Sequence, residues 1–232
     1  MIEEILRQGE IEVQGRLVDA SNATLLISLS HNGATLDAIY KPVAGERPLW
    51  DFPDGNLAQR ERAAYLISEA MNINCVPLTI LRDGPFGVGM VQQWIDIDES
   101  VQLEEYFHSD DPQLRMVALF DAVINNTDRK IGHLIPDLQQ KLYVCDHGVT
   151  FHVDDKLRTV LWQWAGQSFT EDEIRTLDSL LTLLRSNQIA ELPSLITAEE
   201  ITALMLRVES LLTTGTFPEP NPEWPHIPWP PF

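Results

Sequence analysis

The hydrophobic pattern of this 232-residue chain changes its period near residue 95. Before that point, residues 10–18 alternate between apolar and polar, as in a strand whose two faces differ. Four further β-rich runs, at residues 24–29, 36–40, 76–81 and 89–95, give five predicted strands in all. Between the third and fourth runs, apolar residues repeat at helical spacing from Leu57 to Met71. Residues 1–95 are therefore predicted to form a β-rich N-lobe, a five-strand sheet plus one helix.

After residue 95 the pattern is mainly helical. Apolar residues repeat at helical spacing over residues 110–124, 170–184 and 197–212, and the last two segments begin with capping boxes. Residues 215–232 are rich in Pro and Trp and predict an extended tail, either a docking strap or a segment packed on its own domain. The fold class predicted is α+β, with residues 96–214 as a short helical C-lobe.

Two short motifs in the middle of the chain each place an acid where the backbone must turn. Asp128 follows the helix that ends near Ile124, and Asp146 follows the apolar run before Gly148. Two carboxylates on neighbouring turns suit a divalent metal or the removal of a hydroxyl proton. The alternative is two Asp residues in ordinary turns. Arg129, next to Asp128, is a candidate ion-pair partner for it.

A lysine at the end of the third predicted strand is a candidate phosphate ligand. Lys41 follows an apolar run, and such a lysine can reach a nucleotide phosphate as a point charge. Glu61, on the predicted helix, is the favoured residue to orient it, with Glu46 as a rival. The alternative for Lys41 is an edge-strand lysine that prevents aggregation.

Two further segments are candidates for contact with a nucleotide. Ser21 and Asn22 lie at the tip of the first predicted hairpin, where backbone N–H groups could meet a phosphate. Gln92, Gln93 and Trp94 lie at the junction of the two predicted lobes, where backbone groups could pair with an adenine edge. An ordinary turn and an ordinary strand end with a core Trp are the alternatives.

The composition restricts the class of partner. The formal net charge is −19 and the pI is about 4.5, which disfavours binding to nucleic acid and to anionic membrane surfaces. No segment resembles a signal peptide or a membrane span, so a cytoplasmic protein without membrane insertion is expected. Cys75 and Cys145 lie in hydrophobic contexts and predict buried free thiols.

Several of these segments resemble known kinases. Residues 126–133, with the sequence N-T-D-R-K-I-G-H, resemble the N-T-D-R-H-x-x-N loop of HipA-like kinases and the D-R-H-x-x-N loop of phosphatidylinositol 3-/4-kinases. Residues 146–148, D-H-G, resemble the metal-binding D-x-G of the same superfamily. Residues 45–52 and 156–162 resemble an uncharacterised bacterial family, found in actinobacteria and Chloroflexi, that is related to phosphatidylinositol 3-/4-kinases.

This resemblance, which spans about residues 8–212, implies a protein-kinase-like fold that binds ATP. It implies that Lys41 is the phosphate lysine, Glu61 its helical partner, Asp128 the catalytic aspartate and Asp146 the ligand of Mg²⁺. Lys130 stands where the family has His, and it is a candidate for contact with the γ-phosphate or with an acidic substrate.

A second departure concerns the metal. His133 stands where the family has the second metal ligand, Asn, and Mg²⁺ prefers oxygen to imidazole nitrogen. Three readings stay open: one metal ion suffices, Mn²⁺ is used with His133 as a ligand, or catalysis is impaired.

The sequence thus predicts an ATP-dependent phosphotransferase whose acceptor is a protein or a soluble metabolite rather than a lipid. Two alternatives are a regulatory module that binds a nucleotide without phosphoryl transfer, and an enzyme that transfers AMP. The acceptor and the oligomeric state are not predicted.

Overall fold

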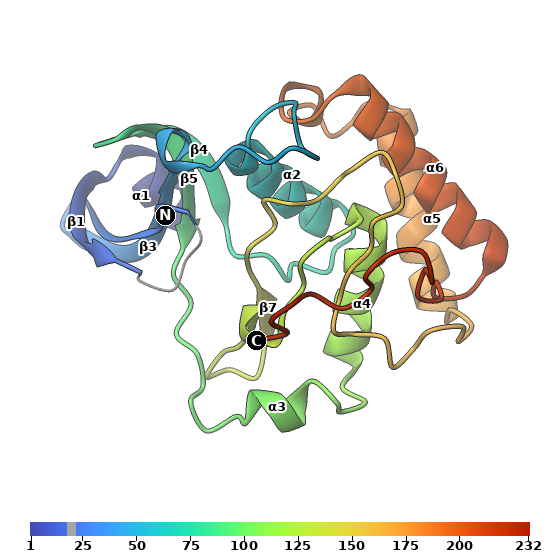
Figure 1. The fold of residues 1–232 in the computed structure, drawn as a ribbon. Coiled ribbons are helices and arrows are strands. Elements are labelled where there is room, and N and C mark those ends of the chain that lie inside the picture. The colour runs from blue at the N-terminus through green and yellow to red at the C-terminus, as the bar shows by residue number, and fades with distance from the viewer. Residues whose placement is uncertain (18–21) are drawn as a thin grey trace.

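A five-stranded antiparallel sheet forms one side of the computed structural model, which describes residues 1–17 and 22–232 (Figure 1). The spatial order of the strands is β1-β2-β3-β5-β4. All five predicted runs are confirmed as strands, with shifted ends. Their bounds are β1 Glu10–Arg16, β2 Leu25–His31, β3 Ala34–Pro42, β4 Thr79–Gly84 and β5 Gly87–Gln93.

Two helices, rather than the single one predicted, accompany this sheet. The predicted helix is α2, Leu57–Ala70, and a short helix α1, Ile2–Gln8, precedes β1. The side chains of Ile5 and Leu6 are buried in the cluster that covers one face of the sheet. A seven-residue helix has little intrinsic stability, so this burial holds α1 in place. The prediction of one helix was wrong because so short a segment shows no helical period.

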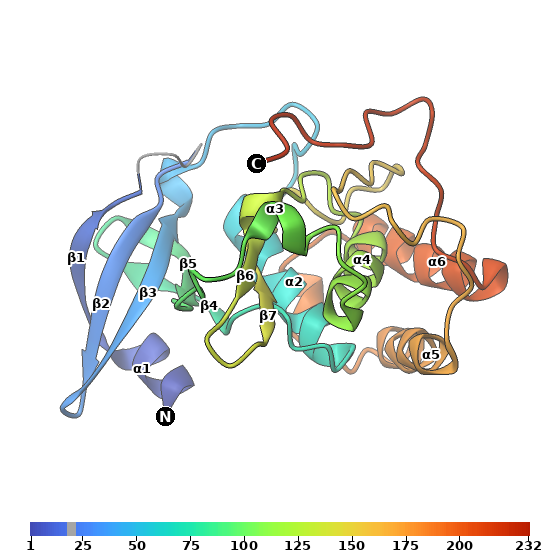
Figure 2. The ribbon, with the colours of Figure 1, turned by 90° about the horizontal axis from the view of Figure 1, so that it is seen from below.

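The helical lobe begins after β5. Its helices are α3 Leu103–Tyr106, α4 Pro112–Ile124, α5 Glu171–Arg185 and α6 Ala198–Thr214, and a small hairpin joins β6 Leu134–Pro136 to β7 Leu142–Val144. Short 3₁₀ turns cover Val43–Gly45, Ile131–His133 and Leu192–Ser194. Helices α5 and α6 lie together at the end of the molecule farthest from the sheet (Figure 2). The molecule is therefore an α+β protein of two lobes, as predicted.

The described helices include none whose length and apolar character would let it cross a lipid bilayer. Both cysteines are free thiols, with Cys75 buried and Cys145 half-buried.

The Pro- and Trp-rich tail packs on its own chain. It leaves α6 and runs back to end near the middle of the molecule (Figures 1 and 2). Phe217 is buried against Phe169, and the carbonyl of His226 accepts a hydrogen bond from the backbone N–H of Thr159. Trp229, in contrast, is 88% exposed. Backbone hydrogen bonds and Phe217 thus hold the tail against the rest of the chain.

Candidate functional site

The structure brings Lys41, Glu61 and Asp146 together from three segments. Lys41 lies on β3, paired with β5, and its Nζ is 2.7 Å from Glu61 Oε1 on α2. The same Nζ is 3.0 Å from Asp146 Oδ1, which follows β7. Glu46, the rival partner, is occupied elsewhere: its carboxylate accepts the N–H groups of Leu57 and Ala58 at the start of α2. Lys41 therefore has the partner that the sequence favoured.

The charges of this cluster stabilise one another. Burial alone would raise the pKa of Glu61, but the Lys41 ammonium and the His147 N–H group hold it well below its ordinary value. Lys41 likewise lowers the pKa of Asp146, and the two carboxylates raise the pKa of Lys41 despite its burial. All three groups are therefore ionised at neutral pH. Asp146 is 52% exposed at its side chain, so the cluster is open to solvent on that side.

A buried network supports this cluster from the helical lobe. The backbone N–H of His147 donates to Glu61 Oε2 at 3.0 Å, and His147 Nε2 lies 2.7 Å from Arg129 Nη2. Arg129 also donates to the carbonyl of Cys145 and forms a paired contact with Asp121 on α4. The two lobes are thus connected by hydrogen bonds from Lys41 to α4.

Arg129 is therefore not the partner of Asp128, as the sequence had indicated, but of Asp121. Both side chains are fully buried. Sequence reasoning missed Asp121 as a site residue, although an acid on the apolar face of a predicted helix was a usable signal: such a group needs a buried partner.

Asp128 lies in the turn that follows α4. Asn125 ends the helix in the left-handed conformation, with φ 52°, and the N–H of Asp128 donates to Asn126 Oδ1. Burial raises the pKa of Asp128, although Lys130 and Arg158 act in the opposite direction. Their side-chain nitrogens lie 3.7 Å and 3.8 Å from the carboxylate. A carboxylate of raised pKa is suited to accept a proton.

Arg158 is a second residue that sequence reasoning missed. It lies on the segment after Asp146, which runs parallel to the loop of Asp128: the Arg158 N–H donates to the Asn126 carbonyl, and the Arg129 N–H donates to the Arg158 carbonyl. This pairing joins residues about thirty positions apart, and no local pattern in the sequence reveals it.

His133 lies beside Asp146, and both of its ring nitrogens face groups of the protein. Its Nδ1 accepts the backbone N–H of Lys130 at 3.4 Å, and its Nε2 lies 3.6 Å from Asp146 Oδ2. Burial lowers the pKa of His133 to about 4, so the ring is neutral at pH 7. With Nδ1 as acceptor, the proton lies on Nε2 and faces the carboxylate.

Of the two predicted metal ligands, only Asp146 offers an oxygen atom to Mg²⁺. Within residues 1–17 and 22–232, no three His, Cys, Asp or Glu side chains group as a metal site. Mg²⁺ commonly takes one or two carboxylates and completes its shell with substrate phosphates and water. Asp146 supplies a half-exposed carboxylate oxygen of this kind, on a residue held at φ 63°.

The N–H groups in the segment predicted to contact adenine already donate hydrogen bonds within the protein. The side-chain amide of Gln92 is buried against Thr79, the N–H of Gln93 donates to the Leu78 carbonyl, and the N–H of Trp94 donates to the Asp37 carbonyl. Adenine recognition by these N–H groups stays a prediction and requires these bonds to open.

The phosphate contacts predicted for the first hairpin stay a prediction. Asn22 Oδ1 accepts the N–H of Arg47, which fixes its side chain against the loop after β3. Ser21 lies outside the described residues.

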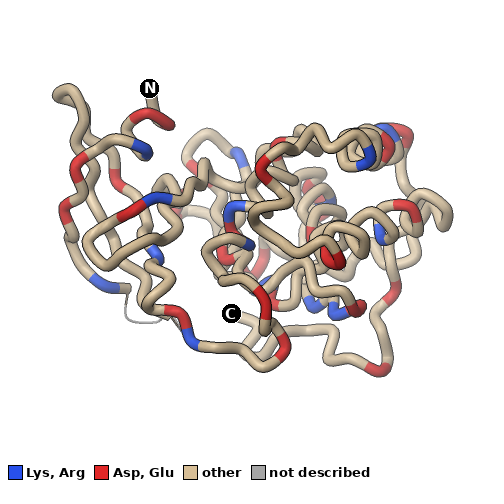
Figure 3. Tube along the Cα trace, turned by 90° about the horizontal axis from the view of Figure 1, so that it is seen from above, with Lys and Arg blue, Asp and Glu red and all other residues tan. Residues whose placement is uncertain are grey.

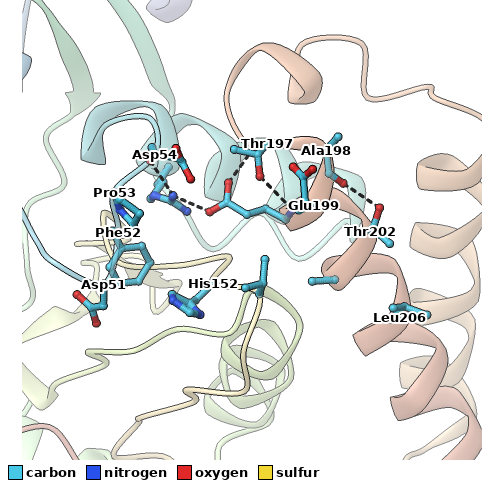
Figure 4. A pocket seen from close by; sticks show the side chains of 14 residues that line it. Asp51, Phe52, Pro53, Asp54, His152, Thr197, Ala198, Glu199, Thr202 and Leu206 are labelled. Carbon is cyan, nitrogen blue, oxygen red and sulfur yellow. Dashed lines mark hydrogen bonds and ion pairs between the residues drawn. The ribbon is translucent and has the colours of Figure 1, made fainter.

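A pocket of about 700 Å³ lies elsewhere, between residues 51–54, His152 and the start of α6 (Figure 4). Arg60 and Glu200 form an ion pair of 2.6 Å in its wall, and Arg60 stacks on Phe52. Neither Lys41 nor the two motif aspartates line it. It is therefore separate from the charged cluster.

Solved structures with a similar fold include kinases. The Golgi casein kinase superposes with a TM-score of 0.59 at 13% identity, over 92% of this chain and 73% of that one. The Helicobacter pylori proinflammatory kinase CtkA gives 0.53 at 11% identity, over 91% and 94%. Hydra Fam20, in a structure with sugar, gives 0.55 at 10% identity, over 90% and 86%. These likenesses show a kinase-like two-lobe fold.

No protein-family model matches the chain. A curated relative, Protein Rv2133c of Mycobacterium tuberculosis (strain ATCC 25618 / H37Rv), is 40% identical over 263 aligned positions, which cover 98% of this chain and 94% of the relative. The chain therefore belongs to the family of Protein Rv2133c.

Proposed function

We propose that this protein is an ATP-dependent phosphotransferase, related to the HipA-like and phosphatidylinositol 3-/4-kinase-like enzymes. One observation carries the proposal: Lys41 Nζ contacts Glu61 on one side and Asp146 on the other, at 2.7 Å and 3.0 Å. A strand lysine paired with a helix glutamate, next to a metal-binding aspartate, is the arrangement that kinases use to hold nucleotide phosphates. A Golgi casein kinase structure with this fold is described with Mn/ADP bound.

The roles follow from position and charge. Lys41 would bind a phosphate of ATP, Glu61 would orient Lys41, and Asp146 would hold Mg²⁺ or Mn²⁺, which neutralises phosphate charge when bound. Asp128 would accept the proton of the acceptor hydroxyl. As that oxygen forms its bond to the γ-phosphorus, the bond from the γ-phosphorus to the bridging oxygen breaks, and ADP leaves with the electron pair.

The acceptor is proposed to be a soluble molecule or a protein rather than a membrane lipid. The net charge of −19 disfavours approach to an anionic bilayer. Asp and Glu are distributed along the chain in both lobes (Figure 3).

A second function, nucleotide binding without transfer, is supported by His133. The imidazole occupies the place of the expected amide ligand, and its ring nitrogens face Lys130 and Asp146. A chain that bound ATP there without consuming it would gain stability by linkage.

Two aspartate variants test the proposal. Asp146→Ala should abolish the Mg²⁺-dependent binding of a non-hydrolysable ATP analogue, measured by calorimetry. Asp128→Ala should keep that binding and lose turnover of ATP. The matched control is Asp154→Ala, since Asp154 is 75% exposed at its side chain and follows on the same segment.

Labelled ATP separates the three reactions. Transfer of label from the γ-phosphate supports a kinase, transfer from the α-phosphate supports AMP transfer, and binding without transfer supports the regulatory module. Normal turnover by Asp128→Ala would contradict the catalytic role of Asp128.

A further inference from the structure

Arg158 is held rigidly beside the candidate catalytic aspartate. Its Nε donates to the Thr127 carbonyl at 2.6 Å, and its backbone pairs with Asn126 and Arg129 through hydrogen bonds of 2.8 Å and 3.1 Å. The guanidinium is fixed at one nitrogen, while Nη2 extends to 3.8 Å from Asp128 Oδ1. An arginine ordered in this way loses little further conformational entropy when it binds an anion.

Lys130 flanks the same carboxylate from the other side. Its Nζ is 3.7 Å from Asp128 Oδ2, and its side chain is 22% exposed. In the described part of the chain, neither this ammonium nor the terminal nitrogens of Arg158 make a hydrogen bond. Both contacts to Asp128 are longer than a hydrogen bond. The ammonium of Lys130 and the terminal N–H groups of Arg158 are thus available to another partner.

These two cations belong to the acceptor side of the site. Lys41 already provides the cation next to Asp146, where the nucleotide phosphates are proposed to lie. Arg158 and Lys130 instead surround Asp128, the group proposed to take the proton from the acceptor hydroxyl. The γ-phosphate of ATP would also lie near Asp128, so an anion that binds to these cations while an ATP analogue occupies the nucleotide site belongs to the acceptor.

The charge of the whole chain makes such a pair informative. The chain has 16 Lys and Arg residues against 35 Asp and Glu residues, so its long-range field repels anions. A free anion must then bind at a specific site with its own cations, because the long-range electrostatic field of the chain does not attract it.

We propose that Arg158 and Lys130 bind a phosphate group carried by the acceptor, which is accordingly a phosphate ester with a free hydroxyl. Two cations match the two negative charges of a phosphate monoester, and the arginine fork suits its oxygens. This inference names the acceptor class of the proposed phosphotransferase and rests on that function, but its anion site is measurable without any turnover.

The first test measures inorganic phosphate binding to the full chain by ³¹P NMR titration, in the presence of Mg²⁺ and a saturating ATP analogue. The wild-type chain should bind phosphate, and Arg158→Gln should bind it roughly tenfold more weakly or worse. Arg158→Lys, which keeps the charge, should recover part of the affinity. The control is Arg175→Gln, an arginine on α5 that is 66% exposed at its side chain. Thermal melting of each variant shows that it is folded.

Three results would overturn the inference: no phosphate binding by the wild-type chain, equal binding by Arg158→Gln, or displacement of phosphate by the ATP analogue. If the analogue itself fails to bind, the proposed function fails, while phosphate binding in its absence still tests the anion site.

The second test identifies the source of the phosphate. Glycerol 3-phosphate, but not glycerol, should displace inorganic phosphate if the acceptor is a free ester. Displacement only by vesicles that contain phosphatidylinositol 4-phosphate would point to a lipid headgroup. Displacement by neither would end the proposal of a phosphate ester.

Discussion

The carboxylate of Asp121 and the guanidinium of Arg129 form an ion pair in which neither residue is exposed, with Oδ1 3.0 Å from Nη2. Asn126 and Thr159 each donate a further hydrogen bond to the same carboxylate. The loss of one partner would leave a buried charge without compensation. This pair therefore anchors the loops of the candidate site.

Asp121→Asn should lower the free energy of unfolding by about 3–5 kcal/mol, because it leaves the Arg129 charge unpaired in the core. Urea unfolding monitored by circular dichroism measures the change. The control is Glu209→Gln, which removes the partner of Arg185 in an exposed pair and should cost less than about 1 kcal/mol. Equal effects of the two substitutions would show that the buried pair does not stabilise the fold.

Glu61→Gln should weaken the binding of an ATP analogue by roughly tenfold, or about 1.4 kcal/mol, because Lys41 loses the charge that orients it. Calorimetry with Mg²⁺ gives the affinity. Glu69→Gln changes an exposed glutamate on the same helix and should leave the affinity unaltered. An unchanged affinity of Glu61→Gln would remove Glu61 from the nucleotide site.

His133→Asn should raise the preference for Mg²⁺ over Mn²⁺ in analogue binding, because an amide oxygen replaces an imidazole beside Asp146. The observable is the ratio of analogue affinities in the two metals. If the ratio is the same in both proteins, the side chain at this position does not contact the metal ion.

The capping glutamate of α5 should make stability depend on pH. Burial would raise the pKa of Glu173, but hydrogen bonds from Arg115 and the Thr170 N–H lower it below its ordinary value. A lowered native pKa stabilises the fold above the unfolded pKa of about 4.3, and this contribution is lost as the pH falls through the native pKa.

Glu173→Gln should therefore reduce stability at pH 7 by about 1.5–3 kcal/mol, and the difference from wild type should shrink in acid. Unfolding in urea at a series of pH values tests this. Glu171→Gln, in the same helical turn but 94% exposed at its side chain, should show no such dependence. A pH-independent difference for Glu173→Gln would contradict the role of the charge.

Local patterns predicted the strands, the long helices and Glu61 as the partner of Lys41, and the resemblance to kinases implied that Asp146 belongs to the same site. Lys41 and Asp146 could be singled out because each lies at the end of an apolar run or in a turn motif, and Glu61 because it lies on the predicted helix. The α+β class followed from the change of period alone.

The rest depends on contacts between distant segments. Arg158 reaches Asp128 through parallel pairing of two loops, and Asp121 is a site residue only because Arg129 turns inward to meet it. Helix α1 exists because the sheet offers a surface to two of its apolar side chains, Ile5 and Leu6. Such effects come from tertiary packing, which no local window of sequence contains.

The parallel pairing of the two loops fixes the separation of Asp128 and Arg158, whereas Lys41 belongs to the other lobe. A hinge motion of the lobes would change the distance from Lys41 to Asp128, but it would move Asp128 and Arg158 together. The protein would then select acceptors in which the distance between the hydroxyl and the negative charge matches the fixed distance between Asp128 and Arg158.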